Sequence, residues 1–133
     1  MPILEEITFS VNTTGSAGAA VGSASTPDYI RGRIEAVYVA KHADLPNTTD
    51  LTLVESGGAG RTILSLSDIA ASGMYYPTVQ VHDTSGAGVT YDGTRAIRKP
   101  IAIAGRKLTA SIAQSDELTA ALTITLIVSL AGG

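Results

Sequence analysis

Several residue types are missing or scarce in this chain of 133 residues, and each absence excludes something. The chain has no cysteine, which excludes disulfides and thiolate metal sites. It has no tryptophan and one phenylalanine, so the core must be built from Val, Ile, Leu and Ala. Nine basic residues stand against twelve acidic ones, giving a net charge of −3. Because general nucleic-acid binding needs a strong basic excess, we expect no nucleic-acid partner.

Long apolar runs are also missing. None reaches the roughly 18 to 20 residues that a membrane-spanning helix needs. The first nine residues contain Pro2, Glu5 and Glu6, whereas a secretory signal begins with positive charge followed by an apolar stretch. We therefore expect a soluble protein, made in a cytoplasm and without a membrane partner. The chain length fits one domain with one core.

Apolar and polar residues alternate with period two in short segments that Gly, Pro, Asn and Asp separate. The expected strands cover residues 7–11, 31–40, 51–55, 61–66, 77–82, 101–104, 108–112 and 122–130. No helical pattern is long enough for a crossover between parallel strands. The sequence therefore predicts an all-β protein, an antiparallel β-sandwich of jelly-roll type with about eight strands.

Two local features are also expected. The sequence "GRK" at 105–107 is typical of a turn that closes a hairpin between the strands on either side of it. Ser67 is a suitable N-cap and Gly73 a suitable stop, so residues 67–72 are the one place where a short helical turn is expected.

The N-terminal part divides the single domain into a strand or arm with a flexible Gly/Ala/Ser segment, residues 1–26, and a sandwich body, residues 27–133. Residues 15–26 are compatible with a flexible loop, a weak strand of small residues, or an arm ordered by a neighbouring subunit. An apolar strip precedes them, formed by Ile3, Leu4, Ile7 and Phe9. Such a strip either pairs with the open sheet edge of a neighbour or is an ordinary first strand of its own sheet.

Basic residues are concentrated in one part of the chain. Five of the nine lie within thirteen positions: Arg95, Arg98, Lys99, Arg106 and Lys107. A local basic patch can contact an acidic protein surface even on an acidic protein. The alternative is two solvated turns that flank a strand. We therefore list these five residues, with the apolar strip, as candidate interface residues.

Candidate catalytic groups are few. His82 and Asp83, with Tyr91 and Asp92 after them, form the densest polar cluster, but the other histidine, His42, is distant in sequence. We favour the reading in which His82 ends a strand and Asp83 starts a turn through its side chain. No serine lies in a G-x-S-x-G motif. We expect a protein that is not an enzyme and has no metal site and no cofactor.

Three segments resemble a known family: "RGRIEAVYVAKHADLPNTTDLTLVE" at 31–55, "YYPTVQVHDTSGAGVTYDGT" at 75–94 and "KPIAIAGRKLTASIAQ" at 99–114. Their order and style resemble the cement or decoration proteins of tailed bacteriophages, including the jelly-roll cement proteins of podovirus-like phages. The resemblance covers about residues 31–130. It implies a structural protein without an active site, bound to the outside of an icosahedral capsid.

The resulting main hypothesis is a virion protein that binds the major capsid protein at the capsid surface and cements the shell. Its expected self-association is a dimer or trimer. The alternative is a tail or fibre module that recognises a host-surface glycan or another virion protein, with Tyr75 and Tyr76 as the aromatic pair for a glycan. A metal-dependent enzyme of the cupin type is disfavoured because it needs several histidines.

Overall fold

The computed structural model describes residues 3–130, and within that range it contains ten β-strands and no helix. The strands are β1 (Ile3–Val11), β2 (Ala20–Ser25), β3 (Ile30–Lys41), β4 (Asp50–Glu55), β5 (Thr62–Leu66), β6 (Gly73–Tyr75), β7 (Thr78–Gln80), β8 (Arg98–Arg106), β9 (Leu108–Ser115) and β10 (Leu122–Leu130). The all-β prediction is confirmed. Each of the eight expected segments coincides with a strand, and β2 and β6 are additional. The outer limits of the expected segments 1–26 and 27–133 lie outside the described residues.

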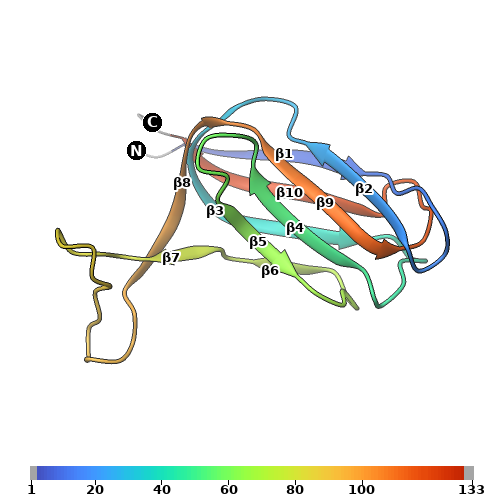
Figure 1. Ribbon diagram of the computed structural model, residues 1–133. Helices are drawn as coiled ribbons and strands as arrows, with labels where there is room; N and C mark the ends of the chain where they lie inside the picture. Colours follow the sequence, from blue (N-terminus) through green and yellow to red (C-terminus); the bar gives the residue numbers. More distant parts are fainter. Residues whose placement is uncertain (1–2, 131–133) are drawn as a thin grey trace.

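The strands pair in the order that defines a jelly roll. The first four pair in reverse order with four later ones: β1 with β10, β2 with β9, β3 with β8, and β4 with β5. Two antiparallel sheets result (Figure 1). The first sheet has the order β1-β10-β3-β8-β7, with β6 also paired to β3, and the second has the order β2-β9-β4-β5. Folding a long paired ribbon into two facing sheets is the jelly-roll arrangement.

The core lies between the two sheets and is aliphatic, as the composition predicts. Alternate residues of β10 point inward and are fully buried: Leu122, Ile124, Leu126 and Val128. Leu51 and Leu53 of β4 come from the facing sheet and are equally buried. Full burial of one such side chain contributes about 1.5 to 3 kcal/mol, so this layer supplies most of the driving force for folding.

The predicted hairpin at 105–107 is wrong. β8 pairs with β3 and β7 in the first sheet, whereas β9 pairs with β2 and β4 in the second, so the chain crosses between sheets here. Gly105 permits the sharp change of direction because its φ is +72°. Ile103 and Leu108 are both buried, and they enter the same core from opposite sides. Period-two alternation is identical for a hairpin and for such a corner, which is why the sequence did not distinguish them.

The helical turn expected at 67–72 does not form. Asp68 has a φ of +52°, which lies in the left-handed region, and its amide donates to Oδ1 of Asp50 at 3.0 Å. The next amide, that of Ile69, donates to the carbonyl of Thr49 at 2.9 Å. The Ile69 side chain is buried. Burial of this side chain and bonding to the β4 region therefore replace the local helical hydrogen bonds.

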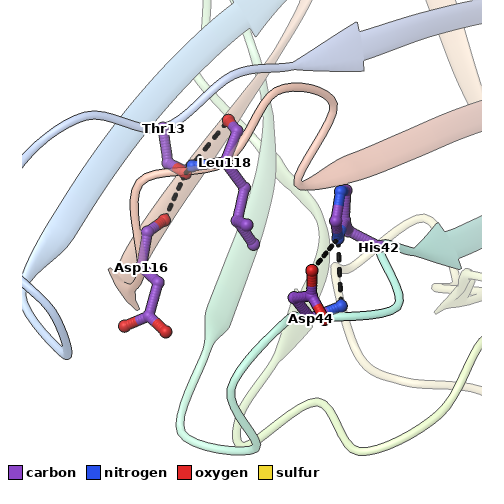
Figure 2. Close-up of polar contacts among 5 residues, drawn as sticks. All are labelled: Thr13, His42, Asp44, Asp116 and Leu118. Atoms are coloured by element: carbon purple, nitrogen blue, oxygen red, sulfur yellow. Dashed lines mark hydrogen bonds and ion pairs between the residues drawn. The ribbon is translucent and has the colours of Figure 1, made fainter.

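At the end of the sandwich opposite β7, Thr13 joins the turn after β1 to the connection between β9 and β10. Its hydroxyl donates to the carbonyl of Asp116 at 2.5 Å and accepts from the amide of Leu118 at 3.0 Å. Its own amide donates to the carbonyl of Leu118 at 3.0 Å (Figure 2). Of the three alternatives for residues 15–26, the structure contains a strand, β2, which pairs with β9.

Candidate protein–protein interface

The apolar strip of the N-terminal strand is divided between the core and the surface. β1 pairs along its whole length with β10, from Ile3 opposite Leu130 to Val11 opposite Leu122. Phe9 is buried and Ile7 packs against the core, but Ile3 and Leu4 are 56% and 64% exposed. Within the described residues β1 is thus an ordinary first strand of its own sheet, at the edge of that sheet. Its start presents two apolar side chains to solvent.

A long segment leaves the sandwich between β6 and β8. Figure 1 shows it as an arm, in yellow and orange, that extends beyond one end of the sheets. We define the arm as residues Tyr76–Pro100; none of these residues, all in the described part of the chain, is buried. β7 and the start of β8 form its stem through the pairs Thr78–Pro100 and Gln80–Arg98.

Beyond its stem the arm is a three-way junction of backbone hydrogen bonds. The amide of Val81 donates to the carbonyl of Ile97 at 2.7 Å, that of Ile97 to Val89 at 2.9 Å, and that of Val89 back to Val81 at 2.7 Å. The three residues are eight positions apart. Bridges between His82 and Gly88 and between Thr90 and Ala96 extend two short hairpins from this ring.

Aspartate side chains hold the tips of both hairpins. Oδ1 of Asp83 accepts from the amides of Ser85 at 2.8 Å and Ala87 at 3.0 Å. Oδ1 of Asp92 accepts from the amides of Thr94 at 3.0 Å and Arg95 at 2.6 Å. The bonds from Arg95 and Thr94 lower the pKa of Asp92 below its ordinary value. Apart from Val79 in the stem, which packs against the sandwich core, the arm is therefore ordered by local hydrogen bonds.

The second tip also carries one of the basic candidates. The guanidinium of Arg95 pairs with Oδ2 of Asp92 at 3.1 Å and lies 5.9 Å from the centre of the Tyr91 ring. Its Nη1 donates to the Tyr91 hydroxyl at 3.2 Å. Arg95 is thus held on the tip surface with its side chain largely exposed.

The five basic candidates do not form one patch. Arg95, Arg98 and Lys99 belong to the arm, whereas Arg106 and Lys107 lie at the far end of β8. At about 3.3 Å per residue, the nine-residue strand separates the two groups by roughly 26 Å. A second cationic group, which includes residues that the sequence analysis missed, lies at that far end. The guanidinium of Arg31 lies beside Gly105, and that of Arg106 lies against Gly58.

Arg61 is a second cation that the sequence did not indicate, and its side chain is fixed in place. Its guanidinium makes a two-pronged ion pair with the buried carboxylate of Glu55, with Nε–Oε1 at 2.8 Å and Nη2–Oε2 at 2.9 Å. Nη2 also donates to the carbonyl of Ala102 in β8 at 2.6 Å. The hydrogen bond from Arg61 is the main cause that lowers the pKa of Glu55 below its ordinary value. The Arg61 guanidinium therefore joins the two sheets, and its role is structural.

The outward face of the first sheet carries small hydroxyl side chains at the β1–β10 pair. The hydroxyls of Thr8 and Thr125 lie 3.1 Å apart, and those of Ser10 and Thr123 lie 3.2 Å apart. In each pair the two hydroxyls bond to each other across the strands.

The candidate aromatic pair is divided in the same way as the apolar strip. Tyr75 packs against the core, whereas Tyr76 is 69% exposed, because neighbouring residues of an extended chain point to opposite sides. Tyr38 and Met74 lie directly opposite each other on β3 and β6, and both are exposed. Tyr76 therefore shares its surface with Met74 and Tyr38, not with Tyr75.

The polar cluster at His82 and Asp83 lies on the first hairpin of the arm, away from His42. His42 lies just after β3, where its Nδ1 accepts from the amide of Asp44 at 3.0 Å (Figure 2). Among residues 3–130 no group of three or more His, Cys, Asp or Glu side chains is placed to hold a metal ion. Over the same residues there is no helix of the length and apolar character needed to cross a membrane.

No protein-family model and no curated protein matches the chain. Among solved structures, the chain is similar to one titled "Structure of infectious bursal disease virus Gt strain", with 15% identity and a TM-score of 0.35. The match covers 99% of this chain and 32% of that one, so the chain spans about a third of its length. This TM-score is too low to establish a common fold. The jelly-roll assignment depends on the strand order and register of this chain alone.

Proposed function

We propose that this chain is a structural virion protein that binds the major capsid protein on the outer surface of a phage capsid and cements the shell. In this proposal it is not an enzyme and needs no cofactor. It is made in the host cytoplasm and functions on the virion as a dimer or trimer. The sequence resemblance suggests the capsid as the partner, and the arm is the structural observation that carries the proposal.

The arm supports a binding role because it is ordered without a core of its own. Fixing the backbone of one residue costs about 1 to 2 kcal/mol, and a typical hydrogen bond returns a net 0.5 to 1.5 kcal/mol. The ring at Val81, Val89 and Ile97 and the two aspartate turns supply such bonds, but no arm residue in the described chain is buried. A segment held in shape but left uncovered is preorganised for contact with another protein.

A cement protein works by mass action. It binds the assembled shell and not the separated subunits, so binding favours the intact capsid. The jelly-roll body provides a rigid support for this, and the arm provides a surface that extends beyond it (Figure 1). Many copies that each add a modest interface produce a large total gain in stability.

The test is co-sedimentation with expanded capsids that lack the protein, followed by thermal disruption of the complexes. The informative variant replaces residues 82–96 with Asn-Gly. The amide of Val81 donates to the carbonyl of Ile97, so the two ends of the removed segment lie opposite each other and a two-residue turn can join them. We expect the wild type to bind and to raise the disruption temperature, and the variant to bind at least about tenfold more weakly.

The control for this experiment is a variant altered on the body, D44K/E117K, because both side chains are exposed and neither lies in the arm. It should bind like the wild type. A wild-type protein that ignores capsids and assembles onto tails would refute the proposal. Binding to a glycan array that is lost in Tyr76→Ala would favour the tail or fibre alternative.

A further inference from the structure

The two edges of the first sheet carry opposite charge. β1 forms one edge and exposes Glu5 and Glu6, while β7 forms the other edge beside Arg98 and Lys99 of β8. Among residues 3–130, none of these four side chains takes part in an ion pair. Ile3 and Leu4, next to the two glutamates, are exposed as well. One edge is thus acidic and partly apolar, and the other is basic.

The guanidinium of Arg98 reaches the free edge of β7. The amide of Val81 donates to the carbonyl of Ile97, so the backbone polar groups of Val81 point toward the β8 side, and this direction alternates from residue to residue along an antiparallel ladder. The carbonyl of Thr78, three positions earlier, therefore points away from β8. Nη2 of Arg98 donates to this carbonyl at 2.8 Å, and Nε donates to the Thr78 hydroxyl at 2.6 Å. The cation consequently lies on the side of β7 where another strand would pair.

The faces of the two edges also match. Residues two apart on a strand point to the same face. On β1, Glu5 therefore points to the same face as Ile7 and Phe9, which is the inward one, and Glu6 points to the same outward face as Thr8. On β8, Lys99 points to the same inward face as Ile101, and Arg98 points to the same outward face as Ala102. In a sheet continued from one copy to the next, Glu6 and Arg98 share one face, and Glu5 and Lys99 share the other.

We propose that a second copy of this chain places its β1 edge, with Glu5 and Glu6, against the β7 edge of the arm, with Arg98 and Lys99. This deepens the self-association part of the proposed function. The contact joins two different surfaces, so repeating it from copy to copy builds a closed ring such as a trimer, or an open filament if the rotation does not close. Each contact covers an exposed sheet edge and the apolar side chains Ile3 and Leu4.

The first experiment is sedimentation of charge-reversed variants in low and high salt. E5K/E6K and R98E/K99E should each raise the dissociation constant of the oligomer by about 100-fold or more, since like charges would meet. The combined variant E5K/E6K/R98E/K99E should restore it. D44K/E117K, which reverses two exposed acids elsewhere, should leave it unchanged. Circular dichroism verifies that each variant folds. A monomeric wild type, or a combined variant that folds but does not reassociate, overturns the proposal.

The second experiment needs no variant. A carbodiimide joins a carboxylate to an amine in direct contact, and the chain has only three lysines. In a mixture of ¹⁴N- and ¹⁵N-labelled wild type, we expect linked peptides that combine Glu5 or Glu6 of one label with Lys99 of the other. Links from Lys99 to other acids alone would refute the contact. Capsid binding is measured separately with the folded E5K/E6K variant. If this variant still binds capsids, capsid binding does not depend on the contact between copies, and each of the two proposals can fail without the other.

Discussion

Arg61 holds the carboxylate of Glu55 in a two-pronged ion pair, with both nitrogen–oxygen distances below 3 Å, and the same guanidinium caps the carbonyl of Ala102 in the opposite sheet. The Glu55 side chain is 5% exposed, so its charge has little water to solvate it. A buried carboxylate persists in a fold only when it is paired and hydrogen-bonded. This pair therefore links the end of β4 to β8 across the sandwich.

Glu55→Gln should lower the free energy of unfolding by about 1 to 3 kcal/mol at pH 7, because the charged hydrogen bonds from Arg61 are lost. The effect should depend on pH. The folded-state pKa of Glu55 is lowered, so its contribution is present above the ordinary value of 4.5 and is lost as pH falls through the folded-state pKa. Urea unfolding at pH 7 and pH 3 should show the two proteins converging in acid. Exposed Glu117→Gln is the control, and an unchanged difference at pH 3 would contradict the assignment.

Gly32→Ala should lower the free energy of unfolding by about 2 to 4 kcal/mol. Gly32 lies in the middle of the first sheet with a φ of +139°, and a Cβ there would collide with the carbonyl oxygen of Ser129. Gly60→Ala is the control that has a positive φ without a collision, since Gly60 has a φ of +63° and no atom near the position of an added Cβ. It should lose only about 1 to 2 kcal/mol. Equal losses in the two variants would mean that the collision is relieved.

Leu126→Ala should cost about 2 to 5 kcal/mol of unfolding free energy, because it opens a cavity between the sheets. Its neighbour Thr125 points outward and contacts only the exposed hydroxyl of Thr8 among the described hydrogen bonds. Thr125→Ala should therefore cost less than about 1 kcal/mol. Denaturant unfolding of the two variants side by side tests which face of β10 is inside. A larger loss in Thr125→Ala would reverse that assignment.

Replacement of residues 82–96 with Asn-Gly should leave the body intact, with a melting temperature within about 5 °C of the wild type. The replaced residues contribute no buried side chain to the described core, and the remaining stem ends at the hydrogen bond from the Val81 amide to the Ile97 carbonyl. Differential scanning calorimetry measures this directly, and a two-state transition is expected. A collapse in stability would show that the arm belongs to the folding unit of the body.

The candidate interface was predictable only in part. Leu4 and Arg98 were identified from composition and local clustering, and both are exposed. The separation of Arg98 from Arg106 was not predictable, because neighbours in sequence lie far apart along one extended strand. Arg61 was missed because its partner, Glu55, is reached across a loop. The ring at Val81, Val89 and Ile97 consists of backbone bonds, which leave a weak trace in side-chain pattern. The spacing of eight residues between these apolar positions was the one available signal.

The sequence by itself determined that the chain forms strands and which side of each strand is buried. In β10 the alternation from Leu122 to Val128 suffices, because burying apolar area requires one face of a pleated strand to be apolar. Only the tertiary structure decided which strands pair. β8 and β9 are adjacent in sequence and have the pattern of a hairpin, yet they belong to different sheets. That choice depends on backbone hydrogen bonds between residues far apart in the chain, and these are insensitive to side-chain type.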